Sequence, residues 1–485
     1  MSSLQPVIGL EVHVQLSTAT KMFCRCRNRF GDPPNTNVCP VCLGLPGSLP
    51  VANCQAIEYG MKAGLVLNCS IARFSKFDRK NYFYPDLPKN YQISQYDLPM
   101  CGTGWLDADV HGERTRFGIT RVHLEEDAGK LVHDNPGGES LVDLNRAGTP
   151  LLEIVSEPDM RSPEEAYAYL TTLRQLISYL GISDCTMEEG SLRCDANVSI
   201  RPQGSKTLGT KVEIKNMNSF KSVEKALAYE IRRQTAAVES GEPIVQETRL
   251  FDAATEKTSP MRSKEQAHDY RYFPDPDLVP LTFSDEQVAR WRAELPEAPG
   301  ARKTRFVTAF ELSAYDAAVL TADRACADYF EEVVRAGAPA KPAANWIANN
   351  LLAKLNEEQR SIVTCPITPV HMAAMILMVE RKEISSTNAK NDVFPELFSS
   401  GKPPADIAAA KGLAQVCDTG QIDLWVRQAI ERNPDSLASL REGKVKAAGK
   451  IVGAVMQASK GKANPALVNA RLRVILGTDH GITLP

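Results

Sequence analysis

Acidic, imidazole and basic side chains recur at alternate positions in several segments of this chain. In residues 7–16, Glu11, His13 and Gln15 alternate with apolar residues. Strict alternation predicts a strand with one apolar and one polar face. Three later segments repeat the pattern, with polar faces that carry Arg121, His123 and Glu125; Arg193, Asp195, Asn197 and Ser199; and Lys211, Glu213 and Lys215. The polar face of such a sheet could hold a metal ion and a phosphorylated ligand, although antiparallel sheets also commonly turn a polar face to water.

Four of the 12 cysteines form a second candidate site. They are spaced as Cys24-x-Cys26 and, twelve residues later, Cys39-x-x-Cys42. Paired cysteines on a short loop are typical of tetrahedral zinc sites. The zinc would be structural, because four thiolates leave no open coordination position. The alternative is four free thiols in a loop.

The elements that must position these residues mix strands and helices up to about residue 290. A helix is predicted from Ser162, which can cap it, with Pro163 in the first turn and Glu165 completing a capping box; Gly181 would end it. A second helix is predicted from Ser222 to Arg233. Neither helix alternates regularly with single strands, so we expect an α+β fold with a largely antiparallel sheet over residues 1–294.

The rest of the chain is predicted to be entirely helical. A Pro-rich segment near residue 296 separates it from the first domain, and Lys402-Pro403-Pro404 divides it into a helical domain, 295–405, and a tail domain, 406–485. Between Arg441 and Leu476 there are eight Lys or Arg residues and one acid, Glu442. This local excess fits contact with a nucleic-acid backbone, or equally a solubilising helical face.

The bulk composition excludes some classes of protein. The 485 residues predict two to four domains, and the net charge of -3 gives no overall sign of nucleic-acid binding. No apolar run approaches the roughly 20 residues that cross a bilayer, and the N-terminus lacks the pattern of a leader, so we expect a cytoplasmic protein without membrane contact.

No common nucleotide-binding motif is present. The stretch Gly443–Lys450 has one residue too many between its glycines for a phosphate loop, and Ile451 stands where a Ser or Thr would bind magnesium. If the chain uses ATP, it must do so through a carboxylate-bound metal and basic side chains.

A set of longer motifs carries a family resemblance. These are Ile8–His13, Phe77–Asp86, Tyr91–Gln95, His123–Lys130, Asp143–Glu157, Glu188–Asn197 and Lys215–Phe220. Together they closely resemble GatB, the family of B subunits of tRNA-dependent amidotransferases. The resemblance is tight over roughly the first 280 residues and weaker over the helical remainder.

The resemblance implies a reaction and its partners. GatB-like subunits work with a GatA-like amidase and a GatC-like small subunit on tRNA(Gln) charged with glutamate or tRNA(Asn) charged with aspartate. With ATP and Mg²⁺, they phosphorylate the side-chain carboxylate, and ammonia from the amidase displaces the phosphate. The first domain would be a cradle-like catalytic domain, and the tail would contact the tRNA body.

The resemblance also assigns roles to residues. The implied ligands of Mg²⁺, or of Mn²⁺ because imidazole is an unusual ligand for magnesium, are Glu11, His13, Glu125 and Glu153. Lys80 and Glu126 complete the implied catalytic set, and Lys89, Arg193, Asp195, Lys215 and Asn218 would bind nucleotide or substrate. The candidate tRNA contacts in the tail are Lys444, Lys446, Lys450, Lys460, Lys462 and Arg471.

Structural alternatives remain open for several of these residues. Glu125 and Glu126 point to opposite faces of a regular strand, so we expect at most one to bind metal directly. Arg193 could simply pair with Asp195. The alternative function is a non-catalytic tRNA-binding scaffold, which would have no need of convergent acids.

Overall fold

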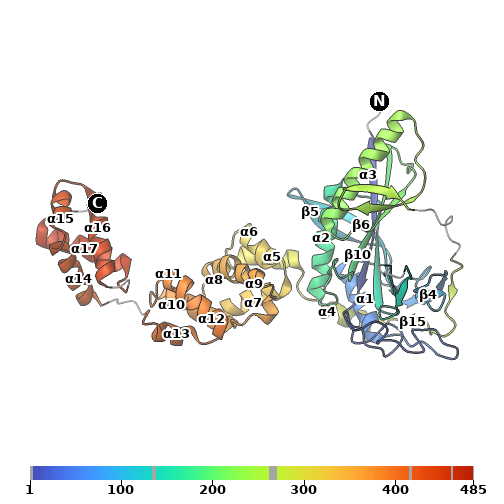
Figure 1. Ribbon diagram of the computed structural model, residues 1–485, viewed down its shortest axis with the longest axis horizontal. Coiled ribbons are helices and arrows are strands. Elements are labelled where there is room, and N and C mark those ends of the chain that lie inside the picture. The colour runs from blue at the N-terminus through green and yellow to red at the C-terminus, as the bar shows by residue number, and fades with distance from the viewer. Residues whose placement is uncertain (1–3, 134–137, 262–269, 414–417, 460–461, 484–485) are drawn as a thin grey trace. The chain divides into compact units, whose positions relative to one another are not determined.

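The computed structural model describes residues 4–133, 138–261, 270–413, 418–459 and 462–483. The chain forms two compact units, Met1–Pro299 and Gly300–Pro485, which are described separately. The first contains all the strands of the described residues, and the second is helical, as the sequence predicts (Figure 1).

An eight-stranded sheet forms the centre of the first unit. In spatial order its strands are β13 (Lys257–Pro260), β12 (Thr248–Asp252), β11 (Val212–Lys215), β10 (Leu192–Pro202), β1 (Leu4–Gln15), β9 (Pro150–Ser156), β6 (Glu113–Glu126) and β5 (Gly104–Val110). Only the β11–β12 pair is parallel among these neighbours, so the prediction of a largely antiparallel sheet is confirmed.

Strand β1 shows how sequence alternation becomes two faces. Its residues from Ile8 to Gln15 alternate between buried and partly exposed. Val12 and Val14 are completely buried, and each fully buried Val or Leu contributes about 1.5–3 kcal/mol through the hydrophobic effect. One face of the strand is therefore fixed in the core, and the side chains of Glu11 and His13 must lie on the other.

Helices cover the apolar face. They are α1 (Cys54–Val66), α2 (Pro163–Leu180), α3 (Phe220–Ser240) and α4 (Asp285–Ala293), and their apolar residues share one core with the sheet. Figure 1 shows α3 lying alongside the long strand β10, and α2 packs against α3 and β5.

The predicted helix boundaries are correct for α2 and too short for α3. The side chain of Ser162 caps α2 and Gly181 ends it in a left-handed conformation. Glu165 does not complete the predicted capping box, because its carboxylate accepts from the backbone N–H of Arg161, one residue before the cap. α3 runs beyond both ends of 222–233, because Ser219 provides an earlier cap and the first left-handed stop is Gly241.

Three small sheets complete the first unit. One has the order β14 (Phe273–Pro274), β3 (Asp78–Asn81), β4 (Tyr91–Ser94). The other two pair β15 (Leu281–Thr282) with β2 (Phe74–Ser75), and β7 (Lys130–Val132) with β8 (Leu141–Asp143). Side chains of β3 and β4 reach the polar face of the main sheet.

The second unit contains two hydrophobic clusters. The first extends from Phe306 to Ala408 and the second from Ile422 to Ile482. Its α-helices are α5 (Pro299–Ala309), α6 (Ala314–Leu320), α7 (Arg324–Arg335), α8 (Ala340–Trp346), α9 (Leu352–Glu357), α10 (Pro369–Glu380), α11 (Ser386–Asn388), α12 (Phe394–Ser400), α13 (Pro404–Ala410), α14 (Thr419–Glu431), α15 (Pro434–Arg441), α16 (Ala448–Ala458) and α17 (Pro465–His480). Short π-helices, Ile347–Leu351 and Ala389–Val393, and 3-10 helices, Ile362–Thr364 and Val445–Ala447, interrupt them.

Two details of this unit bear on the sequence expectations. α13 begins at the predicted Pro-rich break, and its Ile407 and Ala408 belong to the first cluster. Among the described residues, no helix is both long and apolar enough to span a bilayer.

Candidate active site and metal sites

Strand register brings four ionisable side chains into one row across the polar face. His13 on β1 lies opposite Glu153 on β9 and Arg193 on β10, and Glu153 lies opposite His123 on β6. Directly opposed residues in a sheet have side chains about 4.5–5.5 Å apart at Cβ. The row His123–Glu153–His13–Arg193 therefore follows from the hydrogen-bonded register.

Two carboxylates, Glu153 in this row and Glu125 on β6, lie close to the imidazole nitrogens of His13 and His123. His13 Nε2 is 3.4 Å from Glu153 Oε2 and 3.7 Å from Glu125 Oε1. His123 Nε2 is 3.4 Å from the same oxygen of Glu153 and 3.8 Å from Glu125 Oε2. Ligand atoms of His13, Glu125 and Glu153 all lie within 4.8 Å of one another, so these three residues could hold a metal ion.

The electrostatics of the cluster keep its carboxylates ionised despite burial. Burial opposes ionisation of Glu153, but the charges and hydrogen bonds of His123 and His13 outweigh it and hold the pKa of Glu153 well below its usual value. Burial also disfavours a charged His123, yet Glu153 and Glu125 raise the pKa of His123 to about 9. Two carboxylates that face imidazoles in a partly enclosed hollow can offer oxygen and nitrogen ligands to a divalent cation.

Glu11 lies beside this trio and is not one of the three mutually close ligands. Its Oε1 accepts a hydrogen bond of 3.0 Å from Asn197 Nδ2 on the neighbouring strand β10. Burial, and then the charge of Glu153, raise the pKa of Glu11. The structure therefore brings His13, Glu125 and Glu153 together and places Glu11 next to them, on the β10 side.

Glu126 faces away from the cluster, as the alternation of strand β6 predicts. Its Oε1 pairs with Lys89 Nζ and accepts a 3.0 Å hydrogen bond from the backbone N–H of Ile93. This pair of predicted site residues is thus a buried ion pair beside the cluster.

Lys80 reaches the cluster from the central strand of the small sheet. Its ammonium lies 4.9 Å from the centre of the Tyr270 ring and 5.9 Å from that of Tyr82. Burial disfavours the charged form, but Glu125 and Glu153 outweigh it and raise the pKa of Lys80. Lys80 is therefore a cation held on the β6 side of the cluster.

The remaining predicted ligand-binding residues form ion pairs and a helix-end contact. Arg193 does not pair with Asp195: its Nη2 donates to Asp127 Oδ2 at 2.6 Å. Asp195 instead accepts from Lys215 Nζ, also at 2.6 Å. Asn218 accepts a 3.1 Å hydrogen bond from Ser222 Oγ at the start of α3.

A cavity opens beside Glu11 and is lined by residues of β1, β9 and β10. Its volume is about 270 Å³, and Glu11, Asn197 and Lys211 contribute polar groups to an otherwise largely apolar wall that includes Val7 and Leu208. A small number of polar groups in an apolar cavity is typical of ligand sites.

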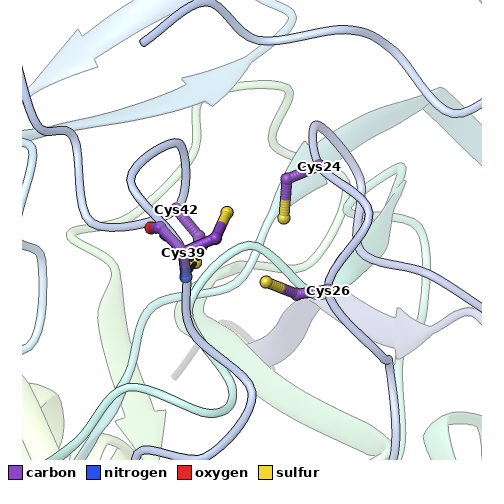
Figure 2. A group of neighbouring side chains, drawn as sticks. All are labelled: Cys24, Cys26, Cys39 and Cys42. Atoms are coloured by element: carbon purple, nitrogen blue, oxygen red, sulfur yellow. Dashed lines mark hydrogen bonds between the residues drawn. The ribbon is translucent and has the colours of Figure 1, made fainter.

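The cysteine cluster forms a separate site in the same unit. Figure 2 shows that Cys24 and Cys26 come from one loop and Cys39 and Cys42 from another, with thiols directed into the space between the loops. Ligand atoms of all four lie within 4.8 Å of one another. A hydrogen bond from Cys24 lowers the pKa of Cys42 to about 5 against the effect of burial, so one thiolate is favoured even before a cation is bound. The donor set fits tetrahedral zinc.

Contacts around the cysteine loop tie it to the main sheet. Lys21 is completely buried, with its Nζ 3.8 Å from Cys42 Sγ and 3.3 Å from the carbonyl oxygen of Leu144. Asn145 Oδ1 accepts a 2.8 Å hydrogen bond from the backbone N–H of Asn37. The loop 24–42 is therefore packed against the segment that leads into strand β9.

The predicted tail residues have different environments. Lys446, Lys450 and Lys462 are exposed, and Lys444 pairs with the neighbouring Glu442 at 2.9 Å. Arg471 is held by Asp423 in a two-pronged ion pair with both distances 2.5 Å, so part of its charge is neutralised within the helical cluster. Lys460 lies outside the described residues.

Two residues of the site were missed as candidates by sequence reasoning. His123 shares its strand face with Glu125, a signal that the alternation already contained. Asp127 is 5% exposed and accepts hydrogen bonds from Gln15 and Arg193, but it follows the end of β6, where alternation no longer predicts direction.

The fold and this site define a class of protein: an α+β domain with a carboxylate–histidine site on an antiparallel sheet, followed by helical domains. A family model described as the GatB/GatE catalytic domain matches residues 6–289, and one described as a GatB domain matches residues 328–476. The chain belongs to the GatB family.

Named relatives agree over almost the full chain. The B subunit of the aspartyl/glutamyl-tRNA(Asn/Gln) amidotransferase of Geobacter sp. (strain M21) is 56% identical over 471 residues, which cover 96% of this chain and 98% of that protein. The protein of the same name from Brevibacillus brevis is 54% identical over 478 residues, 99% of this chain and 100% of that protein.

Proposed function

We propose that this chain is the B subunit of an ATP-dependent amidotransferase that converts Glu-tRNA(Gln), Asp-tRNA(Asn) or both to the matching amide. The observation that carries the proposal is the row His123–Glu153–His13 with Glu125 beside it, within a chain that matches a GatB/GatE catalytic domain. The reaction supplies aminoacyl-tRNA for protein synthesis, so we place it in the cytoplasm, with GatA-like and GatC-like subunits as partners.

The chemistry requires activation of a poor electrophile. A carboxylate resists attack by ammonia because its oxygen is a poor leaving group. In the first step a substrate carboxylate oxygen bonds to the γ-phosphorus of ATP and the bond to ADP breaks. In the second step the ammonia nitrogen bonds to the acyl carbon, phosphate leaves with the electrons of the C–O bond, and a proton is released.

The first step brings two anions together, the substrate carboxylate and the γ-phosphate of ATP. His13, Glu125 and Glu153 are the residues that would hold a divalent cation, with Glu11 next to them, and when bound it would supply positive charge for the transferred phosphoryl group. Lys80 would orient the substrate carboxylate from the β6 side. Arg193, positioned by Asp127, would meet phosphate oxygens from the β10 side.

The cavity beside Glu11 suits the nucleoside of ATP. Its apolar wall can cover a flat base, and Lys211 and Asn197 offer donors at its edge. Lys215 and Asp195 pair on the neighbouring strands, which positions Lys215 on the same polar face. In this arrangement the nucleoside occupies the cavity beside Glu11 and the acyl group lies near Lys80.

The test is Glu125→Gln in the assembled complex. Removing the carboxylate charge should lower ATP-dependent amidation by about 100-fold or more, since electrostatic groups in a transition state typically contribute this much. The affinity for tRNA should stay unchanged. Measurements are single-turnover amidation of misacylated tRNA and filter binding of the same tRNA.

The matched control is Glu113→Gln, an exposed carboxylate on the same strand β6. This variant should keep wild-type activity. Full amidation by the Glu125→Gln complex would contradict the proposed function and favour a subunit that only holds tRNA in place.

A further inference from the structure

Four tyrosines form a continuous row of rings beside the candidate active site. The rings of Tyr96 and Tyr272 are stacked, with centroids 4.1 Å apart and planes 9° from parallel. Tyr270 meets Tyr272 edge to face at 6.0 Å, and Tyr82 meets Tyr270 at 5.9 Å. The row runs in the order Tyr96, Tyr272, Tyr270, Tyr82.

The small sheet β14–β3–β4 holds this row in place. Tyr82 directly follows β3, Tyr96 comes after β4, and Tyr270 and Tyr272 precede β14. The backbone N–H of Asn81 donates to the carbonyl of Tyr270 at 2.9 Å, and its side-chain amide donates to that of Arg271 at 2.8 Å. Segments nearly 200 residues apart in sequence are thereby joined, so the rings are positioned by a hydrogen-bonded frame.

The inner end of the row lies at the carboxylate–histidine cluster. The Lys80 ammonium lies over the last two rings of the row, 4.9 Å from the centre of Tyr270 and 5.9 Å from that of Tyr82. Ser94, two residues before Tyr96, donates a 3.1 Å hydrogen bond to Glu125 Oε2 and so connects β4 to the cluster. Burial raises the pKa of Tyr272 against the opposing charge of Lys80, and the charges of Glu125 and Glu153 act in the same direction as burial.

The outer end of the row is open. Tyr96 is 51% exposed although Tyr272 covers one of its faces, so its other face is turned to solvent. Arg121, on strand β6, donates to the carbonyl of Tyr96 at 3.4 Å and brings a positive charge to this end. An exposed aromatic face with an adjacent cation is the arrangement that binds single-stranded nucleic acid by stacking.

We propose that the open face of Tyr96 stacks against the terminal adenine base at the 3′ end of the tRNA, so that the amino acid on the terminal ribose reaches the carboxylate–histidine cluster. This inference rests on the proposed function and names the residues that position its acyl substrate. The row spans from an open ring to Lys80 and Glu125. In an aminoacyl-tRNA, the 3′ base at the outer end of the row and the amino-acid carboxylate at the inner end are parts of one molecule.

The alternative occupant of this face is the adenine of ATP, and the separate cavity beside Glu11 argues against it. The cavity with Glu11, Asn197 and Lys211 is lined by residues of β1, β9 and β10 and the segment 208–211, and none of the four tyrosines lines it. A phosphoryl group transferred between two substrates needs them on opposite sides. With the nucleoside in the cavity beside Glu11, the tRNA end belongs at the tyrosines.

The experiment compares uncharged tRNA with and without its terminal adenosine on the assembled complex. Wild type should bind the intact tRNA more tightly. Tyr96→Ala should weaken binding of intact tRNA by between about 5-fold and about 150-fold, the range expected from loss of base stacking, and should leave binding of the shortened tRNA unchanged. Tyr96→Phe should bind both as wild type does, because it keeps the ring.

Controls separate this proposal from its alternatives. Tyr167→Ala, an exposed tyrosine on α2, should change neither affinity. An equal loss of affinity for intact and shortened tRNA in Tyr96→Ala would overturn the stacking proposal. No preference for intact tRNA in the wild type would also overturn it. So would a rise in the KM of the Tyr96→Ala complex for ATP without a rise in its KM for tRNA. The binding assay needs no turnover, so it stands apart from the Glu125→Gln test of the reaction.

Discussion

At the scale of single residues, the site is a set of charges held at short range by strand register. Glu153 faces two imidazoles, and Glu125 faces the same two from the next strand. Carboxylates buried without partners would take up protons, because burial disfavours the charged form. The histidines therefore keep the oxygens of the cluster available as anionic ligands.

Lys80 gives the sharpest prediction at this scale. Lys80→Met removes a cation near Glu125 and Glu153 while keeping most of the side-chain volume. We expect the single-turnover rate of amidation at saturating tRNA and ATP to fall by about 100-fold, because a positioned charge acts on the transition state. The KM for ATP should change little, since Lys80 does not line the proposed nucleoside cavity beside Glu11.

The matched control for Lys80 is Lys206→Met, an exposed lysine that follows β10. It should leave the rate unchanged. A Lys80→Met complex whose rate is normal but whose KM for ATP is raised would assign Lys80 to the nucleotide instead of the carboxylate.

At the scale of elements, we expect the two cysteine-containing loops to stabilise the neighbouring edge of strand β9. Cys24 and Cys26 belong to one loop and Cys39 and Cys42 to another, so a bound ion would join segments that have little regular structure of their own (Figure 2). Lys21 and Asn37 connect the same region to Leu144 and Asn145, just before β9. A change in the loop is therefore expected to reach the strand that carries Glu153.

The zinc content of the purified chain tests whether the four cysteines bind a metal ion that stabilises these loops. The purified chain should hold about one zinc ion, since four thiolates complete one tetrahedral shell. Cys39→Ser should lose the metal, and amide hydrogen exchange should rise in residues 20–51 and 143–149, because metal binding and folding of such a loop are coupled. Metal analysis and exchange measured by mass spectrometry provide the two readouts.

Cys54→Ser is the control, because Cys54 is an exposed cysteine outside the cluster. It should keep the metal and the wild-type exchange pattern. Full zinc retention by Cys39→Ser would contradict the four-cysteine site.

At the scale of the whole molecule, we propose that the reaction and the 3′ end of the tRNA belong to the first unit and that the helical tail binds the body of the tRNA. The carboxylate–histidine site lies in Met1–Pro299, and the basic surface lies in the last helical cluster of Gly300–Pro485. The net charge of the chain is -3, so any attraction for tRNA must be local. Lys446 and Lys450 are exposed in that cluster, whereas Arg471 is engaged by Asp423.

Charge reversal in the tail tests this assignment. Lys446→Glu with Lys450→Glu should weaken tRNA binding and flatten its salt dependence, because each phosphate contact contributes about 0.7–0.9 to the slope of log affinity against log salt. The rate of amidation at saturating tRNA should be unchanged. The measurement is binding of tRNA by the complex across a series of salt concentrations.

A second double reversal serves as the control. Lys341→Glu with Lys402→Glu changes the charge of the same unit by the same amount, at exposed positions before the tail. It should leave the salt slope near that of wild type. Equal slopes for the tail variant and the wild type would reject the tail as a phosphate-binding surface.

The sequence by itself determined the polar faces of the four alternating segments and where the chain becomes helical. Alternation has a period of two, so burial of Val12 and Val14 leaves no choice for the direction of His13, and it likewise turns Glu125 and Glu126 to opposite sides. The end of α2 at Gly181 could be predicted for an equally local reason, because a left-handed residue stops a helix.

Only the tertiary structure decided which of these residues meet. The pairing of β1 with β9, and of β9 with β6, places His13 and His123 on either side of Glu153 and leaves Glu11 one step away, beside Asn197. It also joins Arg193 to Asp127 instead of to Asp195. Register and strand order arise from hydrogen bonds and packing between distant segments, and no periodicity within one segment encodes them.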